Sequence, residues 1–275
     1  MEKRRLDTLL AERGLFASRS RAAASVMAGE VRLGAGERRA AKPSEMVDVE
    51  ELVTLAARPQ YVSRGGIKLA NALAATTVQV SGRRALDIGA STGGFTDCML
   101  QRGAREVIAV DVGYGTLDYR LRIDPRVVVM ERTNARTLEP EQLPAGAPGA
   151  TGLPDLATID VSFISLRKVL AAVLACLAPG YDLLALVKPQ FEVGRGRVGK
   201  GGVVRDPSLR REVLVEVGES ATALGAGVLG YRSSGLPGPK GNRETFIWLA
   251  DPARGGDAAA GDAAELETMA REVEP

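Results

Sequence analysis

The sequence predicts an α/β fold, in which a Rossmann-like sheet carries helices on both faces and a small α+β domain precedes the sheet. The first observation is the apolar run of residues 85–88, which leads directly into a turn of small residues and then into a segment compatible with a helix. The second is the pair of apolar runs 106–110 and 126–130, which follow as the next strands of a parallel sheet would. The third is the N-terminal segment, residues 1–57, which is more basic and has shorter elements.

The turn after the first strand predicts a site for a nucleoside. Glycines let the backbone approach a ligand closely, and the helix that follows presents free N–H groups. Because Gly89 is followed by Ala90 and Ser91, the G-x-G-x-x-G turn of dinucleotide sites is absent. The turn therefore suits a ligand with one nucleoside and no pyrophosphate, a description that S-adenosylmethionine meets. The expected cofactor contacts in this segment are Asp87, Gly89, Ala90, Ser91, Thr92, Gly93, Gly94 and Phe95.

Two polar residues after the next strands extend this site. Asp111 lies 22 residues after Gly89, where an acidic residue that binds ribose hydroxyls is expected. Asn134 follows the third strand and can both donate to and accept from an adenine edge. The alternative is that Asp111 caps a loop and Asn134 forms a turn. Their joint position behind this turn favours the nucleoside site.

The composition excludes several classes of protein. The longest apolar run, residues 169–178, is far shorter than the roughly 20 residues that a membrane helix needs, and the N-terminus lacks the apolar segment of a signal peptide. Two cysteines, Cys98 and Cys176, do not indicate a disulfide framework, so we expect a cytoplasmic protein. The absence of histidine excludes Ser-His-Asp hydrolases and most zinc sites, and no other feature indicates a required metal.

The net charge of +2 is unevenly distributed. The last 25 residues carry seven acids and two bases, whereas residues 1–42 carry ten bases and five acids. Residues 195–211 add six bases against one acid. A basic body with an acidic tail favours a polyanionic partner.

The chain divides into four segments by pattern. Residues 1–57 form a small module with two short helices and a few strands, and residues 58–62 form an extended linker because Pro59 disfavours a helix at its neighbour. The predicted catalytic domain spans residues 63–250, with a surface loop over residues 140–154. Residues 251–275 form an acidic tail that we expect to begin flexible and to end in a short helix.

Four charged residues stand where strands end or helices begin. Asp160 and Lys188 close the predicted strands 156–159 and 183–187, and ligands of parallel α/β sheets bind at these ends. Taken singly, Lys68 is explained as a solvated helix lysine, Glu244 as an exposed strand carboxylate and Asp160 as a helix cap. Lys188 is the least ordinary, because a lysine that closes a buried strand needs a partner.

The N-terminal segment resembles the small RNA-binding module first known from a primary ribosomal protein of the small subunit. The resemblance rests on Arg5-Leu6-Asp7, Ser18-Arg19, Gly29-x-Val31 and Lys42-Pro43, and Gly34-Ala35-Gly36 departs from the usual Val-Asn-Gly turn. It implies RNA contacts by basic residues of this module, and basic glycine-rich loops of the larger domain would add further contacts. The predicted RNA-binding residues are Arg5, Arg19, Arg21, Lys42, Arg64, Arg195, Arg197 and Lys200.

The order Lys68, Asp160, Lys188, Glu244 behind this turn resembles the catalytic tetrad of ribose 2'-O-methyltransferases of the FtsJ/RrmJ type. Together with the N-terminal module, residues 3–250 resemble the TlyA family of rRNA cytidine-2'-O-methyltransferases, once described as hemolysins. The resemblance implies a class I methyltransferase sheet, S-adenosylmethionine as cofactor and Asp160 as a further cofactor contact. It also implies methylation of cytidine ribose in the RNA of both ribosomal subunits, with no membrane and no obligatory protein partner.

The chemistry favours a lysine as the group that manages the proton. A sulfonium methyl is already activated, so the enzyme must align the attack and accept or orient one hydroxyl proton. Burial or a neighbouring cation lowers the pKa of a lysine, so we expect Lys188 to act as the base or the hydroxyl-orienting group. For Phe163 we expect a place in the core, and the alternative is that its ring stacks on an RNA base.

Three alternatives remain open at this stage. One is a 2'-O-methyltransferase acting on another RNA, and one is a ribosome-assembly binding protein with an inactive site. The third is a membrane-lytic hemolysin, which the lack of a spanning segment disfavours.

Overall fold

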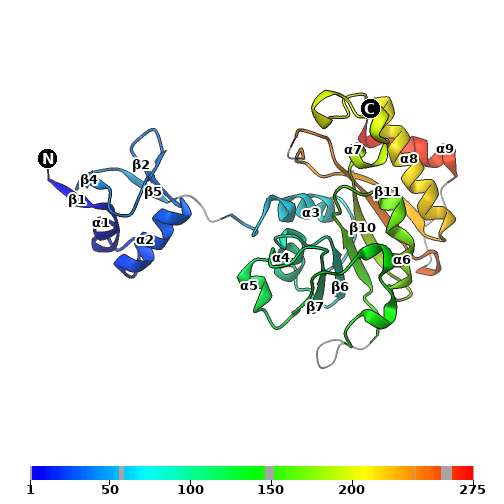
Figure 1. The fold of residues 1–275 in the computed structure, drawn as a ribbon, viewed down its shortest axis with the longest axis horizontal. Helices are drawn as coiled ribbons and strands as arrows, with labels where there is room; N and C mark the ends of the chain where they lie inside the picture. Colours follow the sequence, from blue (N-terminus) through cyan, green and yellow to red (C-terminus); the bar gives the residue numbers. More distant parts are fainter. Residues whose placement is uncertain (1, 56–58, 146–151, 239, 255–261, 275) are drawn as a thin grey trace. The chain divides into compact units, whose positions relative to one another are not determined.

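The computed structural model describes residues 2–55, 59–145, 152–238, 240–254 and 262–274. Contacts between residues divide the chain into two compact units, residues 1–59 and 60–275, which are treated separately below (Figure 1). Residues 146–151 of the predicted loop 140–154 and residues 255–261 of the predicted tail lie outside the described residues. None of the described helices is long and apolar enough to cross a membrane.

The smaller unit packs two helices against short antiparallel strands. Ser18 caps the second helix by accepting a hydrogen bond from the backbone of Arg21, and Gly29 ends it in the left-handed conformation. Leu6, Leu10 and other apolar side chains form a core of its own. The elements are β1 (Lys3–Arg5), α1 (Leu6–Glu12), α2 (Arg19–Ala28), β2 (Val31–Leu33), β3 (Arg38–Arg39), β4 (Met46–Asp48) and β5 (Val53–Leu55).

The larger unit alternates strands and helices around one sheet. Its strands are β6 (Arg84–Ile88), β7 (Glu106–Val110), β8 (Val127–Met130), β9 (Leu156–Ile159), β10 (Asp182–Val187), β11 (Gly227–Ser233) and β12 (Thr245–Ala250). Its helices are α3 (Arg64–Ala74), α4 (Gly94–Gln101), α5 (Tyr119–Arg122), α6 (Leu170–Ala175), α7 (Pro189–Glu192), α8 (Pro207–Ala223) and α9 (Ala263–Val273). Short 3-10 turns include η1 (Ala135–Thr137), η3 (Leu166–Lys168) and η4 (Arg195–Arg197).

The sheet has seven strands in the order β11-β12-β10-β9-β6-β7-β8. The strands from β10 to β8 are parallel, while β12 runs antiparallel between β10 and β11. The central strands are buried along their whole length, which explains their continuous apolar runs. This architecture confirms the predicted α/β fold class.

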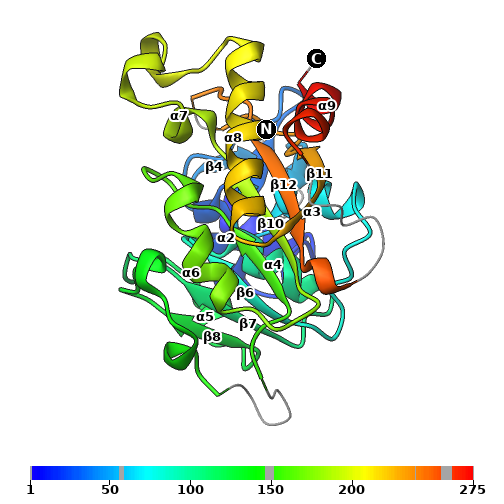
Figure 2. The same cartoon turned by 90° about the vertical axis from the view of Figure 1, so that its right-hand side faces the viewer.

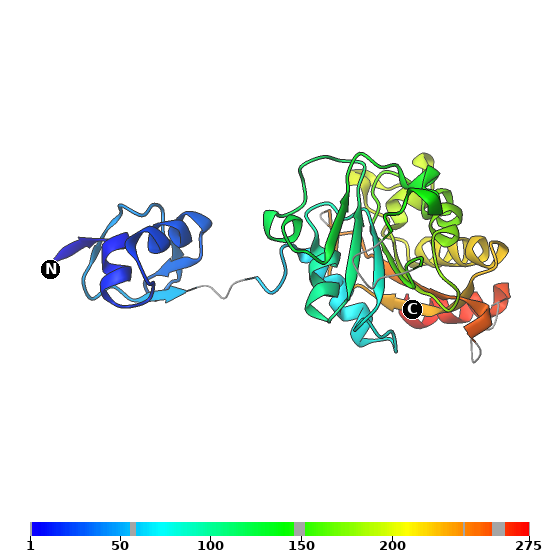
Figure 3. The same cartoon turned by 90° about the horizontal axis from the view of Figure 1, so that it is seen from below.

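Helices cover both faces of the sheet, as Figures 1 and 3 show. Alternate strand residues serve the two faces: Leu86 and Ile88 join the cluster beneath α6, α8 and α9, whereas Ala85 joins the cluster beneath α3, α4 and α5. Figure 2 shows α6 and α8 lying across the strands on one face.

The chain reverses its direction across the sheet between β6 and β9. After β6 the chain builds β7 and β8 on one side and then returns to place β9 on the other side of β6. Ligands of open α/β sheets bind at such a point. Here Gly89, with φ of +81°, passes so close to β9 that a Cβ atom would lie 2.6 Å from the carbonyl oxygen of Asp160. Only glycine fits this crossing.

The predicted linker, residues 58–62, extends three residues too far. The backbone N–H of Val62 donates to the Asp97 carboxylate at 2.8 Å, and the buried Tyr61 hydroxyl accepts a hydrogen bond from Arg102 at 2.8 Å. Both partners lie on or directly after α4, so residues 60–62 are part of the larger unit. The prediction rested on Pro59 alone. It could not show contacts of Tyr61 and Val62 with residues 35 or more positions away in the sequence.

The short helix expected at the end of the acidic tail is present as α9. Leu266 and Ala270 of α9 are fully buried against α8 and β11, and the Glu274 carboxylate accepts a hydrogen bond from Arg210 at 2.7 Å. The helix is a fixed part of the larger unit. The sequence did not reveal that this helix packs against α8 and β11, because those contacts are made with residues far along the chain.

Candidate active site

A groove with two lobes lies at the carboxyl ends of β6, β7, β9 and β10. One lobe, of about 410 Å³, is lined by Lys68 and Lys188, and we call it the lysine lobe. The other, of about 440 Å³, is lined by Asp111 and Asn134, and we call it the Asn134 lobe. Both lobes share the residues Gly89, Ser91, Asp160 and Ser162. Three of the four predicted tetrad residues, Lys68, Asp160 and Lys188, therefore border the same groove as the predicted nucleoside contacts Gly89 and Asp111.

Lys188 and Asp160 form an ion pair where β10 and β9 end. Lys188 Nζ lies 2.5 Å from Asp160 Oδ1 and also donates a hydrogen bond to Ser162 Oγ at 2.9 Å. The Lys188 side chain is only 10% exposed, whereas the Asp160 side chain is 24% exposed. The strand ends thus present a lysine held by two oxygens, with the carboxylate reachable from the groove.

Lys68 and Glu244 form a second, more deeply buried ion pair. Lys68 lies on the inner face of α3, and its Nζ contacts Glu244 Oε2 just before β12 begins. Their side chains are 10% and 1% exposed. Lys68 lines the same lobe as Lys188, so the structure brings the four predicted tetrad residues together as two lysine–carboxylate pairs.

Asp111 organises the turn that follows β6. Its Oδ2 accepts a hydrogen bond from the backbone of Ser91 at 2.8 Å, and its Oδ1 accepts one from Gly113 at 2.7 Å. The bond to Ser91 holds this residue at φ of +50°, a conformation that non-glycine residues rarely adopt. Each carboxylate oxygen retains a lone pair for a further donor, so Asp111 both fixes the turn and lines the Asn134 lobe.

The two interpretations of Asn134, a turn residue and a residue of the nucleoside site, do not exclude each other. Its Oδ1 accepts a hydrogen bond from the backbone of Arg136 and so caps η1. The same residue lines the lobe that Asp111 borders. The turn at Asn134 is confirmed, and its contact with an adenine edge stays a prediction.

Asp87 supports the turn from behind and lines neither lobe. Its side chain is fully buried and accepts hydrogen bonds from the hydroxyls of Thr96 at 2.6 Å and Thr158 at 3.0 Å. Burial raises the pKa of Asp87 to about 6. Asp87 therefore supports the turn, and its expected contact with the cofactor stays a prediction.

The remaining residues of the turn divide in the same way. Gly93, the N-cap of α4 with φ of +93°, lines neither lobe. It packs against Leu121, which a Cβ atom at this position would meet. The turn residues that line the lysine lobe are Gly89, Ala90, Ser91, Thr92, Gly94 and Phe95.

In the smaller unit, a buried aspartate organises two of the predicted RNA-binding arginines. Asp7 accepts hydrogen bonds from Arg5 and pairs with Arg19 Nε at 3.1 Å. The hydrogen bond from Arg5, and to a smaller extent the interaction with Arg19, holds the pKa of Asp7 well below its usual range. Arg21 and Lys42 are exposed. The unit thus presents cations in fixed positions on its surface.

The basic residues predicted to bind RNA in the larger unit differ in the contacts that their side chains make. Arg64, exposed at the first turn of α3, lines the lysine lobe and donates to the carbonyl of Pro237 at 2.9 Å. Arg197 is paired with Glu212 of α8, whereas Lys200 is exposed. The backbone of Arg195 belongs to η4, and its side chain lies outside the described part of the chain.

Two residues after Asp160 were missed or misjudged. Ser162 accepts the hydrogen bond from Lys188, and no sequence signal marked it. Phe163 is 91% exposed with φ of +64°, so its expected place in the core is wrong. Its ring lies 5.2 Å from that of Phe191, which follows Lys188 by three residues. For Phe163, the available signal was its position three residues after the strand-end carboxylate Asp160.

Comparison with known proteins agrees with this geometry. Residues 61–251 match the family of FtsJ-like methyltransferases. The chain is 49% identical over 247 residues to the "16S/23S rRNA (cytidine-2'-O)-methyltransferase TlyA" of Mycobacterium tuberculosis, with 89% of each chain covered. It is 37% identical over 240 residues to "Hemolysin A" of Brachyspira hyodysenteriae, with 87% of this chain and 97% of that protein covered.

A solved structure supports the same grouping. A Streptococcus thermophilus protein described as a hemolysin aligns with a TM-score of 0.69 and 41% identity, covering 99% of this chain and 97% of that one. The chain belongs to the FtsJ-like methyltransferase family and, within it, to the TlyA group.

Proposed function

We propose that this protein transfers a methyl group from S-adenosylmethionine to the ribose 2'-hydroxyl of cytidines in the RNA of both ribosomal subunits. The observation that carries the proposal is the shared groove, in which a Lys–Asp pair and a nucleoside-sized lobe meet at Asp160. The Mycobacterium tuberculosis relative supports the substrate, because its name specifies cytidine ribose in both RNAs.

The donor set of the Asn134 lobe fits S-adenosylmethionine. Asp111 would hold the ribose hydroxyls, Asn134 would meet the adenine edge, and the glycine at position 89 leaves the backbone accessible to the ligand. Asp160 borders both lobes and would contact the cofactor where they join. When bound there, S-adenosylmethionine would supply an activated methyl group.

Lys188 would manage the hydroxyl proton. Lys188 Nζ would accept the 2'-hydroxyl proton or orient that hydroxyl, as the ribose oxygen bonds to the methyl carbon and the carbon–sulfur bond of the methyl donor breaks. Asp160 and Ser162 hold that nitrogen from two sides and thereby fix its direction. Lys68, held by Glu244, presents a second cation to the lobe in which negative charge develops on oxygen.

The RNA would be held by separate features of the two units. The exposed ring of Phe163, whose backbone is in the left-handed region, offers a flat surface for an unstacked base beside the tetrad. Arg64 at the lysine lobe, and the basic residues of the smaller unit, would contact phosphates. Both kinds of contact suit a nucleotide drawn out of a folded RNA.

The test uses small and large ribosomal subunits, each purified from cells that lack this ribose methylation. Incubation with the protein and tritiated S-adenosylmethionine, followed by primer extension at low nucleotide concentration, should give stops at cytidines in both RNAs. Stops in one subunit alone would restrict the substrate, and label only in transfer RNA would replace it. Leakage of dye-loaded liposomes without methyl transfer would favour the hemolysin alternative instead.

A further inference from the structure

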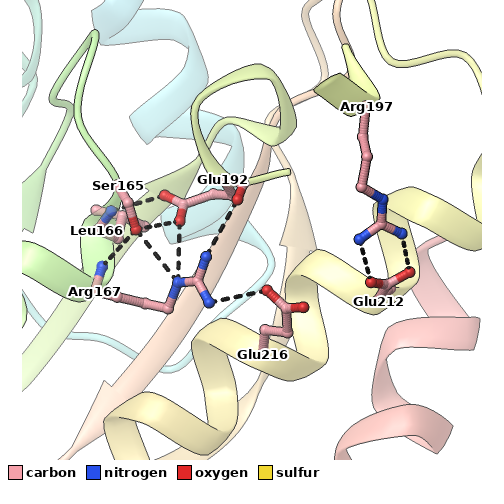
Figure 4. A network of polar contacts seen from close by, with 7 residues as sticks. All are labelled: Ser165, Leu166, Arg167, Glu192, Arg197, Glu212 and Glu216. Atoms are coloured by element: carbon pink, nitrogen blue, oxygen red, sulfur yellow. Dashed lines mark hydrogen bonds and ion pairs between the residues drawn. The ribbon is translucent and has the colours of Figure 1, made fainter. Parts of the chain in front are cut away.

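A buried carboxylate, Glu192, joins the two loops that carry Lys188 and Asp160. Glu192 is the last residue of α7, the short helix that begins directly after Lys188. Its side chain is only 2% exposed. It accepts hydrogen bonds from Ser165 Oγ at 2.5 Å and from the backbone N–H of Leu166 at 2.7 Å, as Figure 4 shows. The loop after β10 is thereby tied to the loop after β9.

The segment between Asp160 and Ser165 is fixed at both ends. At its start, Lys188 holds Asp160 and Ser162, and at its end Glu192 holds Ser165. Between these points lies Phe163 at φ of +64°. Such a conformation costs about 1–3 kcal/mol and persists only where the surroundings impose it. The Glu192 bonds are among the contacts that can impose it.

Burying the carboxylate of Glu192 costs free energy, so stability alone does not explain its use to join two loops. Burial raises the pKa of Glu192, and the hydrogen bonds from Ser165 and Leu166 oppose this rise. Arg167 divides its charge: Nε lies 3.6 Å from Glu192 Oε2, Nη1 pairs with Glu216 on α8 at 2.9 Å, and Nη2 donates to the backbone carbonyl of Glu192 at 3.2 Å (Figure 4). Apolar side chains often replace buried ion pairs without loss of stability.

We propose that Glu192 is a positioning residue for methyl transfer, which keeps Lys188 Nζ and Asp160 Oδ1 in register by tying their loops together behind the groove. The proposal rests on the proposed role of Lys188. Glu192 itself lines neither lobe of the groove. A displacement of about 1 Å at a reacting group can cost about 100-fold in rate, so loss of this tie should lower kcat more than binding.

The test compares Glu192→Ala and Glu192→Gln with the matched control Glu216→Gln. Glu216 is 37% exposed and contacts the outer side of the same Arg167. With saturating RNA and S-adenosylmethionine, kcat should fall at least tenfold for Glu192→Ala and less for Glu192→Gln, whose amide oxygen can still accept from Leu166. The KM values for both substrates should stay within threefold, and Glu216→Gln should remain within twofold of the wild type.

Unchanged kcat in a folded Glu192→Ala protein would overturn the proposal, as would a rise in both KM values with kcat preserved. If that variant does not fold, Ser165→Ala provides the test, because it removes one of the two ties with little change in volume. It should lower kcat about threefold to tenfold, and an unchanged kcat would equally overturn the proposal. Lys188→Ala in the same assay separates the claims: if it retains turnover, the proposed function of Lys188 fails, whatever Glu192 does.

Discussion

Four carboxylates stand at or beside strand ends around the groove, and they divide into two kinds. Asp111 and Asp160 line the groove and retain access to a ligand. Asp87 and Glu244 lie behind it with side chains 0% and 1% exposed, bound to threonine hydroxyls or to Lys68. The difference teaches that the same residue type at the same edge of a sheet is open to a ligand in one layer and closed off by protein partners in the next.

The largest expected effect concerns the groove-facing pair. Lys188→Ala removes the group that receives the hydroxyl proton, so kcat should fall by about 10²–10⁴-fold. Binding of S-adenosylmethionine, measured by calorimetry, should change less than threefold because Lys188 belongs to the lysine lobe and not to the Asn134 lobe. A near-normal kcat would place Lys188 with the supporting residues and break the comparison.

The buried pair should respond first in stability. Lys68→Met leaves the Glu244 carboxylate buried without its cation, which should lower the free energy of unfolding by about 3–5 kcal/mol. Urea unfolding followed by circular dichroism measures this change. Loss of turnover with unfolding free energy intact would show that the buried pair acts on the reaction directly.

A smaller effect is expected at the Asn134 lobe. Asp111→Asn keeps one acceptor for the turn but removes the charge that would bind ribose hydroxyls. The Kd for S-adenosylmethionine should rise by about tenfold to a hundredfold, with kcat at saturation changed little. An unchanged Kd would mean that Asp111 serves only the turn, as Asp87 does.

The smallest effect is a pH dependence of stability at Asp87. Its pKa is raised to about 6 in the folded protein, so between pH 4 and 6 the unfolded chain releases this proton while the folded chain retains it. The carboxyl therefore lowers stability as pH rises, by about 1–3 kcal/mol at pH 7. Relative to the wild type, Asp87→Asn should gain stability between pH 4 and 7 in urea unfolding. Parallel curves across this range would contradict the assigned pKa.

The sequence predicted the strands and the residues at their ends, because continuous apolar runs and their spacing are local signals. Asp160 and Lys188 were found in this way. Whether a carboxylate faces the groove or lies behind it depends on partners far along the chain. Asp87, for example, is held by Thr158 on another strand, so the pattern around residue 87 carries no trace of it.

Other features escaped prediction for a similar physical reason. The left-handed backbone at Phe163 is imposed by tertiary contacts, so an aromatic side chain that usually packs inside is left exposed. Glu192 resembles any surface glutamate at the end of a short helix until Ser165 and Leu166 are brought against it. Local pattern identifies strand ends, whereas the division of labour around the groove arises from long-range contacts.

The most direct test of this division measures Asp160→Asn and Glu244→Gln side by side, each for single-turnover methyl transfer and for urea unfolding. Asp160→Asn should lose at least tenfold in rate and less stability than Glu244→Gln, because the Asp160 side chain is 24% exposed and that of Glu244 only 1%. Glu244→Gln should lose about 3 kcal/mol or more of stability and less of its rate. Equal losses of rate and of stability in both variants would contradict the division between a reacting layer and a supporting layer.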